Sequence, residues 1–137
     1  MNDPDRIELD RLDKARLVTE AALALKGDEP VLLDVRGVSS IADTFLIVSG
    51  RSERQVRAIA ESVVQALKQA GEEVLGHEGL DDGRWVLIDA NDVLVHVFDP
   101  EAREHFDLER LWADAPHIDL EADLGLRLEA EEGADAG

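Results

Sequence analysis

The sequence predicts an α/β fold: a single compact domain with a mixed sheet of about five strands and helices packed mainly on one face. Three observations support this class. The chain has 137 residues, enough for one modest hydrophobic core. Hydrophobic residues make up 45% of it, so a core can form although 34% of the residues are charged. Helical and extended patterns alternate along the chain, and no segment repeats.

The N-terminal half begins with a helix expected over about residues 6–26. Apolar residues recur there at helical spacing, and Gly27 follows as a stop signal. Two β-rich runs come next, residues 31–36 and residues 44–49. Because the turn formers GVSSIAD separate them, we expect two neighbouring strands.

The segment SGRSERQVRAIAESVVQALKQAG carries the clearest helical signal in the chain. Ser52 and Gln55 have the spacing of a capping box, and Gly71 marks the end. The residues between them place one apolar stripe on the helix: Val56, Ile59, Ala60, Val63 and Leu67.

The C-terminal half is expected to begin with a short strand over residues 73–77, followed by a β-hairpin. Asp99 and Pro100 then predict the N-cap and first turn of another helix, and DLERLW predicts one or two further helical turns. We expect the domain to span residues 1–116. Residues 117–137 are rich in Asp and Glu and predict an acidic, disordered tail.

The hairpin WVLIDANDVLVHVF separates into two chemically different faces. A turn at Ala90 and Asn91 pairs Trp85 with His96, Val86 with Val95, and Ile88 with Val93. One face is then aliphatic and suited to cover by helices: Val86, Ile88, Val93, Val95 and Val97. The other mixes large rings with acids: Trp85, Leu87, Asp89, Asp92, Leu94, His96 and Phe98.

Two interpretations of this second face stay open. Its mixture of rings and acids is typical of the centre of a protein interface. Alternatively, Trp85 and His96 pack on another segment of the same chain. If His96 is exposed beside Asp89 or Asp92, it gains charge as the pH falls towards 6, and binding weakens.

Composition excludes several classes of function. The formal net charge of -18 disfavours direct wrapping of nucleic acid and suits a basic partner. The chain has no cysteine, so thiol chemistry is excluded. No apolar run is long enough for a membrane span or a signal core, which predicts a cytoplasmic protein without membrane contact.

Three blocks of sequence resemble the ribosomal silencing factor family, also called Iojap-like: SSIADTFLIVSGRSERQVRAIAESV, HEGLDDGRWVLIDANDVLVHVF and REHFDLERLW. The resemblance implies a domain similar to the nucleotidyltransferase fold, often dimeric. It also implies a translation repressor that docks on ribosomal protein number fourteen of the large subunit and blocks joining of the small subunit. Two positions depart from the family pattern, because Asn91 replaces a glycine and Phe106 replaces a tyrosine.

An enzyme is the alternative to this binder. A nucleotidyltransferase site needs two acids two residues apart on a strand, but the position two after Asp43 is Phe45. Asp34 from the adjacent strand is the remaining substitute. The four histidines lack metal-binding spacing, and the glycines form no phosphate-cradling run, so neither metal nor nucleotide cofactor is expected.

The favoured hypothesis is a non-catalytic binding module whose hairpin face docks on the basic ribosomal protein. The alternatives are the residual enzyme using Asp34 and Asp43, and a dimeric scaffold for another basic partner. Arg51, Arg54 and Arg57 are secondary candidates for contact with ribosomal RNA or with an acidic partner. The expected partner-binding residues are Trp85, Leu87, Asp89, Asp92, Leu94, His96, Phe98 and Phe106.

Overall fold

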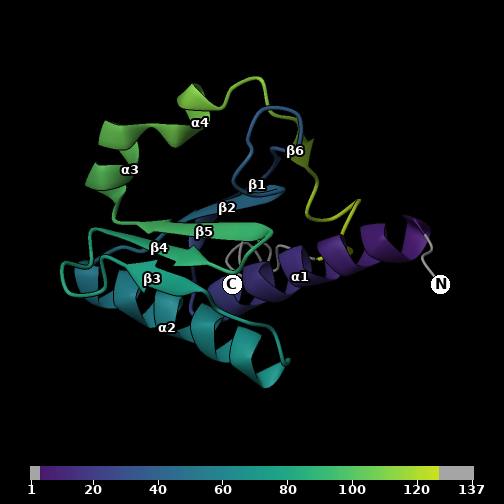
Figure 1. The fold of residues 1–137 in the computed structure, drawn as a ribbon. Coiled ribbons are helices and arrows are strands. Elements are labelled where there is room, and N and C mark those ends of the chain that lie inside the picture. The colour runs from purple at the N-terminus through teal and green to yellow at the C-terminus, as the bar shows by residue number, and fades with distance from the viewer. Residues whose placement is uncertain (1–3, 127–137) are drawn as a thin grey trace, which may run out of the picture.

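A six-stranded sheet forms the centre of the molecule (Figure 1). The computed structural model describes the backbone of residues 4–126 and the side chains of residues 12–126. In the order of the chain the strands are β1 (Asp28–Asp34), β2 (Thr44–Ser49), β3 (Gly76–Glu78), β4 (Trp85–Asp89), β5 (Val93–Phe98) and β6 (His117–Ile118). Their order in the sheet is β3-β4-β5-β2-β1-β6. Among the described strands only β2 and β5 pair in parallel, so the predicted mixed α/β sheet is confirmed, with one strand beyond the expected five.

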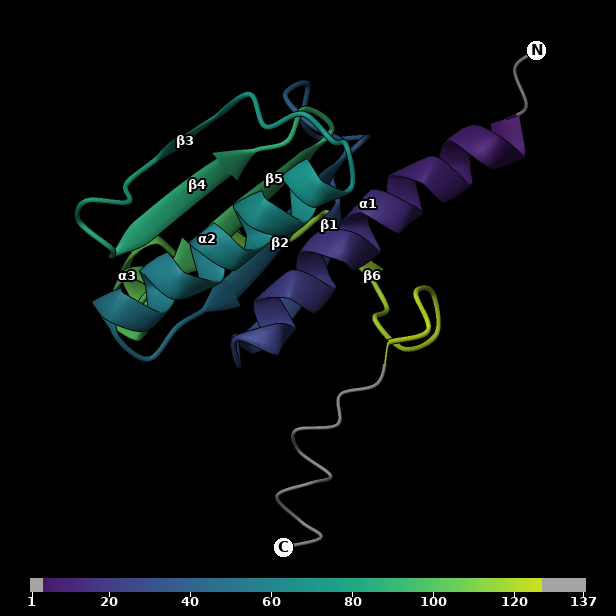
Figure 2. The same ribbon diagram turned by 90° about the horizontal axis from the view of Figure 1, so that it is seen from below.

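Helices cover both faces of the sheet, but unequally. The long helices α1 (Pro4–Ala24) and α2 (Glu53–Gln69) lie side by side on one face, as Figure 2 shows. The short helices α3 (Pro100–Phe106) and α4 (Leu108–Leu111) lie over the other face (Figure 1). The expectation of helices mainly on one face therefore holds for the two long ones.

Helix α2 begins with the predicted cap. The Ser52 hydroxyl accepts a hydrogen bond from the Gln55 backbone N–H at 3.1 Å. In return, the Gln55 side-chain carbonyl accepts from the Arg51 backbone N–H at 2.7 Å, and its amide donates to the Leu25 carbonyl at 3.0 Å. The last bond ties the start of α2 to the chain just after α1. The buried stripe of α2 is the predicted one: Val56, Ile59, Ala60, Val63 and Leu67.

The central strands β2 and β5 are buried along their whole length, because helices lie over both faces of the sheet at its middle. Their parallel pairing joins Thr44 to Val93 and Ser49 to Phe98. The Asp99 carboxylate then accepts from the Ala102 backbone N–H at 2.7 Å, which caps α3 as predicted. Helix α3 therefore starts directly at the end of β5 and turns back over the sheet.

The hairpin of β4 and β5 has the predicted faces but a different register. Trp85 pairs with Phe98, and Ile88 pairs with Val95, whereas the sequence placed His96 and Val93 opposite them. The turn lies one residue later than expected, because Asn91 adopts the left-handed conformation (φ 78°) and Ala90 pairs with Val93. A shift of two residues preserves the alternation of a strand, so each side chain on the paired strands keeps its face.

The domain boundary predicted at residue 116 is wrong. His117 and Ile118 form the edge strand β6, which pairs antiparallel with Leu33 and Leu32 of β1. The following segment also packs into the core through Leu120, Leu124 and Leu126. High acidity concealed this apolar spacing in the sequence. The rest of the predicted tail, residues 127–137, lies outside the described residues.

Candidate protein-docking face

The sheet face under α3 and α4 collects every phenylalanine and tryptophan of the chain. We call this group of rings the aromatic cluster: Phe45, Trp85, His96, Phe98, Phe106 and Trp112. Trp85 stacks on Phe98 with ring centres 5.1 Å apart and touches Phe106 at 4.6 Å. At the other end Trp112 meets Phe45 edge to face at 5.3 Å. Such contacts stabilise the cluster beyond the burial of apolar area.

The aromatic cluster has a buried floor and a partly exposed edge. Phe98 is fully buried, and Leu94 and His96 are 6% exposed, so these three support the face from beneath. Trp85 and Leu87 are half-buried, and Phe106 is 46% exposed. The expected direct contact with a partner is thus open to Trp85, Leu87 and Phe106.

His96 is a neutral member of the cluster. Its Nδ1 accepts a hydrogen bond from the Trp85 indole N–H at 3.3 Å. Nε2 is buried without a hydrogen-bond partner among the described residues. Burial lowers the pKa of His96 to about 4, because the charged imidazolium would lose its hydration. The expected change of charge near pH 6 required an exposed His96, but His96 is buried.

The two acids of the hairpin lie on different sides of the sheet. The Asp89 carboxylate accepts from the Asn91 backbone N–H at 2.9 Å and remains half-buried on the aromatic side. The assignment of Asp92 to the same face is wrong, since its carboxylate lies 2.6 Å from the Lys14 ammonium of α1. Asp92 occupies the turn, where the alternation of a strand no longer fixes direction.

Lys14 joins three segments on the helix-covered side. Besides Asp92, its ammonium contacts the Glu72 carboxylate at 3.1 Å and donates to the Ala90 carbonyl at 3.1 Å. Burial alone would lower the pKa of Lys14, but the hydrogen bonds with both carboxylates outweigh it, and the pKa is raised. Lys14 thus holds α1 against the tip of the hairpin.

Arg103 fixes α3 over the sheet. Its guanidinium donates to the Glu109 carboxylate at 3.0 and 3.2 Å, to the Ser49 hydroxyl at 2.9 Å and to the Asp28 carbonyl at 3.4 Å. A planar guanidinium suits such a fork of acceptors. The contacts span β1, β2 and the start of α4, so they set the position of α3 and of Phe106 at its end.

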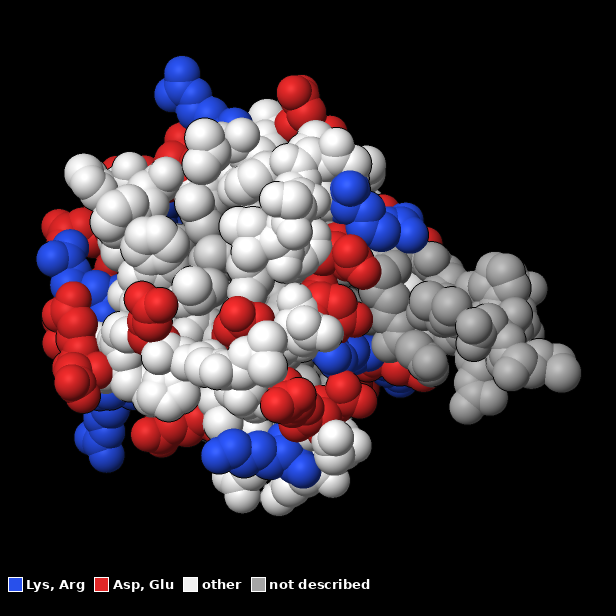
Figure 3. Space-filling view, viewed as in Figure 1, with Lys and Arg blue, Asp and Glu red and all other residues white. Residues whose placement is uncertain are grey.

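The surface above the aromatic cluster is poor in charge. In Figure 3 the upper part of the visible surface is mostly uncharged, acidic side chains lie along its lower border, and basic side chains lie at its top and right borders. Several exposed apolar residues occur in the described part of the chain, including Val38, Ile41, Phe106 and Leu111. This surface therefore has an apolar centre and a charged border.

The three candidate arginines lie at the start of α2 and just before it. Arg51 contacts the Asp28 carboxylate at 3.3 Å, and Arg57 donates to the Asp81 carbonyl at 3.4 Å. Arg54 is exposed on the first turns of the helix. Their role in contacting a partner stays a prediction.

The two candidate acids of an enzyme lie at the ends of neighbouring strands, Asp34 at the end of β1 and Asp43 just before β2. The Asp34 carboxylate contacts the Arg36 guanidinium at 2.7 Å. Asp43 starts the turn into β2, and its backbone N–H donates to the Asp92 carbonyl at 2.8 Å. Among the described residues, no group of three or more acids and histidines is arranged to hold a metal ion.

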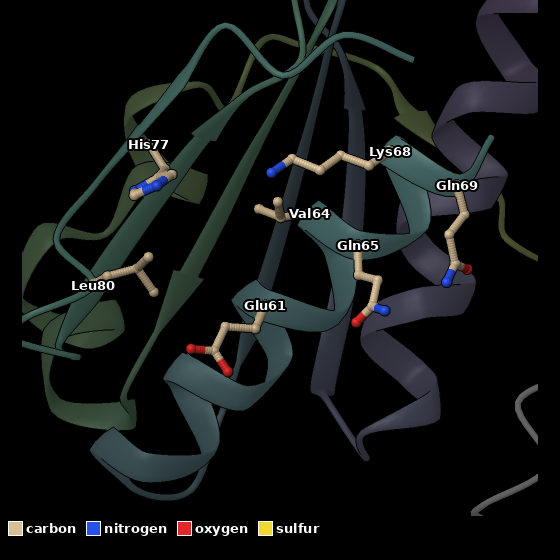
Figure 4. Close-up of a pocket in the computed structure, with 7 residues that line it drawn as sticks. All are labelled: Glu61, Val64, Gln65, Lys68, Gln69, His77 and Leu80. Carbon is tan, nitrogen blue, oxygen red and sulfur yellow. The ribbon is translucent and has the colours of Figure 1, made fainter. Parts of the chain in front are cut away.

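A groove of about 510 Å³ lies on the opposite side of the molecule, between α2 and β3 (Figure 4). In the close-up, Lys68 and His77 face each other across Val64, and Glu61 lies at one end. None of the expected partner-binding residues lines this groove. It is therefore separate from the candidate docking face.

Sequence reasoning missed three contributors to the docking face. Phe45 and Trp112 complete the aromatic cluster, and Arg103 positions α3. The signal for the rings was available, because a chain with only five Phe and Trp residues concentrates them where large apolar surfaces meet. No comparable signal marked Arg103, whose acceptors come from distant parts of the sequence.

Among the described helices, none is both long and apolar enough to cross a membrane.

Comparison with known proteins gives consistent results. A family model described as "Ribosomal silencing factor during starvation" matches residues 8–136. "Ribosomal silencing factor RsfS" from Bacillus subtilis is 45% identical over 105 residues, covering 76% of this chain and 89% of that protein. A crystal structure of a protein from Chromobacterium violaceum has a TM-score of 0.73 and 40% identity, covering 74% of this chain and 84% of that one.

A more distant relative comes from mouse and is named "Mitochondrial assembly of ribosomal large subunit protein 1". It is 34% identical over 73 residues, which cover 51% of this chain and 32% of that protein.

Proposed function

The chain belongs to the ribosomal silencing factor family, and on this premise we propose that it represses translation by binding the large ribosomal subunit and blocking joining of the small subunit. The family gives it a ribosome-associated role in silencing translation. The large subunit as the specific target is our proposal. The name of the mouse relative, which refers to that subunit, supports it.

The observation that carries the proposal is the exposed edge of the aromatic cluster. Trp85, Leu87 and Phe106 offer apolar contact, and Asp89 lies on the same side as an acceptor for a cation. Aromatic anchors at the centre of an interface supply much of its binding energy. Charged groups at the rim contribute to its specificity. We propose ribosomal protein number fourteen as the partner, a choice that comes from the family resemblance.

Silencing by this route is steric and needs no reaction. A protein that occupies the surface on which the small subunit must land lowers the concentration of joinable large subunits by mass action. We further propose that the free protein is a cytoplasmic homodimer. Contact of Arg51, Arg54 and Arg57 with ribosomal RNA is a secondary element of the model.

Sedimentation with purified subunits tests the proposal. We expect the protein to pellet with large subunits alone, and to reduce the fraction of joined ribosomes when it is added before the small subunits. Cross-linking from Trp85 should then reach ribosomal protein number fourteen. Binding to small subunits only, or retention on large subunits with no effect on joining, would contradict the proposal.

A further inference from the structure

A hollow of about 620 Å³ borders the exposed edge of the aromatic cluster, and we infer that it accepts an arginine side chain of the basic partner. Its size lies in the range of ligand-binding pockets. The lining residues come from the loop before β4, from β4 itself and from α3: Asp82, Arg84, Trp85, Glu101, Ala102, His105 and Phe106. This inference rests on the proposed function, because it assumes that this face meets the partner.

Two rings and two carboxylates give the hollow its chemistry. Trp85 and Phe106 lie 4.6 Å apart between ring centres and provide π faces. Asp82 and Glu101 are exposed and bring negative charge beside those faces. A guanidinium is attracted both by an aromatic face and by a carboxylate, and its planar shape allows it to satisfy both at once. An ammonium is a compact, strongly hydrated charge, so lysine should fit this combination less well.

The loop that carries Asp82 is held in place by two glycines. Gly79 and Gly83 have φ angles of 90° and 75°, and the Gly83 N–H donates to the Gly79 carbonyl at 2.9 Å. A Cβ atom at Gly79 would lie 2.0 Å from the Trp85 carbonyl oxygen, which only glycine avoids. The loop therefore has a fixed path into Trp85, and Asp82 and the indole enter the hollow from one short segment.

The hollow already holds one cation of the chain, Arg84. Its guanidinium lies 3.2 Å from the Glu101 carboxylate and 3.7 Å from the Asp99 carboxylate. The Glu101 side chain is 85% exposed and that of Arg84 is 47% exposed, so water screens their pair. Asp99 and Glu101 thus lie near the Arg84 guanidinium, and Asp82 lines the same hollow, so negative charge remains for a second cation from outside.

A titration followed by nuclear magnetic resonance tests the inference without the ribosome. The probe is N-acetyl-arginine amide, and its neutral, nearly isosteric control is N-acetyl-citrulline amide. We expect the arginine probe to shift the Trp85 indole N–H signal, while Trp112, at the far end of the cluster, stays unchanged. A lysine amide should bind more weakly than the arginine probe, and the citrulline control should give no shift.

Matched variants then locate the charge. The double variant Asp82→Asn, Glu101→Gln should weaken binding of the arginine probe by about three- to tenfold. The control Asp114→Asn, Glu121→Gln removes the same charge from exposed positions outside the hollow and should leave the affinity unchanged. Equal weakening in both variants would show a general effect of net charge and overturn the inference. Equal shifts of both indole signals would do the same.

Failure of this inference is distinguishable from failure of the proposed function. If the arginine probe does not bind at Trp85 but large subunits still pellet the protein, the hollow is not an arginine site and the docking function stands. If the probe binds as expected but large subunits are not retained, the hollow accepts a guanidinium and the proposed ribosomal partner is wrong.

Discussion

The two faces of one hairpin show how the same strands serve stability and contact. On the side of α1 and α2, Val86, Ile88 and Val95 are completely buried by aliphatic neighbours. On the other side, β4 leaves Trp85 and Leu87 only half-buried, because the short helices α3 and α4 cover that face incompletely. The long helices bury one face completely, whereas the short ones leave an edge of the other face exposed.

Removing bulk from the covered face should have the largest effect of the changes considered. Ile88→Ala should lower the free energy of unfolding by about 2 to 5 kcal/mol, because it leaves a cavity in a fully buried site. The folded fraction should keep its affinity for large subunits. Thermal unfolding and sedimentation measure the two effects. A stable Ile88→Ala variant that no longer binds would mean that the functions of the two faces are reversed.

Lowering the pH should destabilise the protein through His96, which lies in the buried floor of the aromatic cluster. The pKa of His96 is lowered from 6.5 to about 4, so between these pH values the unfolded chain binds a proton that the folded chain does not. The contribution of His96 to stability is therefore present above pH 6.5 and lost as the pH falls towards 4, in total about 3 kcal/mol.

Urea unfolding of wild type and His96→Gln at several pH values measures this contribution. The carboxylates of the chain titrate in both proteins, so the difference between them isolates His96. If the two proteins lose stability in parallel from pH 6.5 to 4, His96 is not buried in solution as it is in the structure.

The exposed edge should respond in binding more than in stability. Trp85→Ala should weaken association with large subunits by roughly thirtyfold, about 2 kcal/mol, because interface energy concentrates in aromatic anchors. Ile88→Ala on the same strand is the matched control. Unchanged sedimentation of Trp85→Ala with large subunits would remove this edge from the docking surface.

The smallest expected effect separates the two acids of the hairpin. Asp92→Asn should cost about 1 kcal/mol of stability through the weakened contact with Lys14, without loss of binding. Asp89→Asn should instead weaken binding at low salt, since this carboxylate lies on the aromatic side. Thermal unfolding and sedimentation at two salt concentrations compare them. Loss of binding in Asp92→Asn alone would restore Asp92 to the docking face.

Strand periodicity and capping signals were sufficient to predict most of the fold. The parity of the strands assigned Trp85 and Ile88 to opposite faces even though the register was wrong by two residues. The turn itself was misplaced because the choice between Ala90–Asn91 and Asn91–Asp92 depends on which residue adopts a positive φ. That choice is local, and neighbouring strands do not reveal it.

Long-range contacts explain what the sequence missed. Ile118 pairs with Leu32 of β1, and nothing near residue 118 in the sequence indicates this partner. The burial of His96 and Phe98 likewise depends on α3 folding back over the sheet, with Arg103 held by Ser49 and Glu109. Periodicity shows which residues share a face but does not show how completely that face is covered.

The edge strand β6 covers the backbone of β1 at one edge of the sheet. Without it, β1 would present unpaired backbone groups at the apolar residues Leu32 and Leu33. An open, apolar strand edge is a template for intermolecular β-sheet growth and aggregation. The two residues of β6 occupy this template, and the acidic residues Asp119 and Glu121 follow directly after it. A segment whose composition predicts only a solvated tail therefore covers the edge of β1.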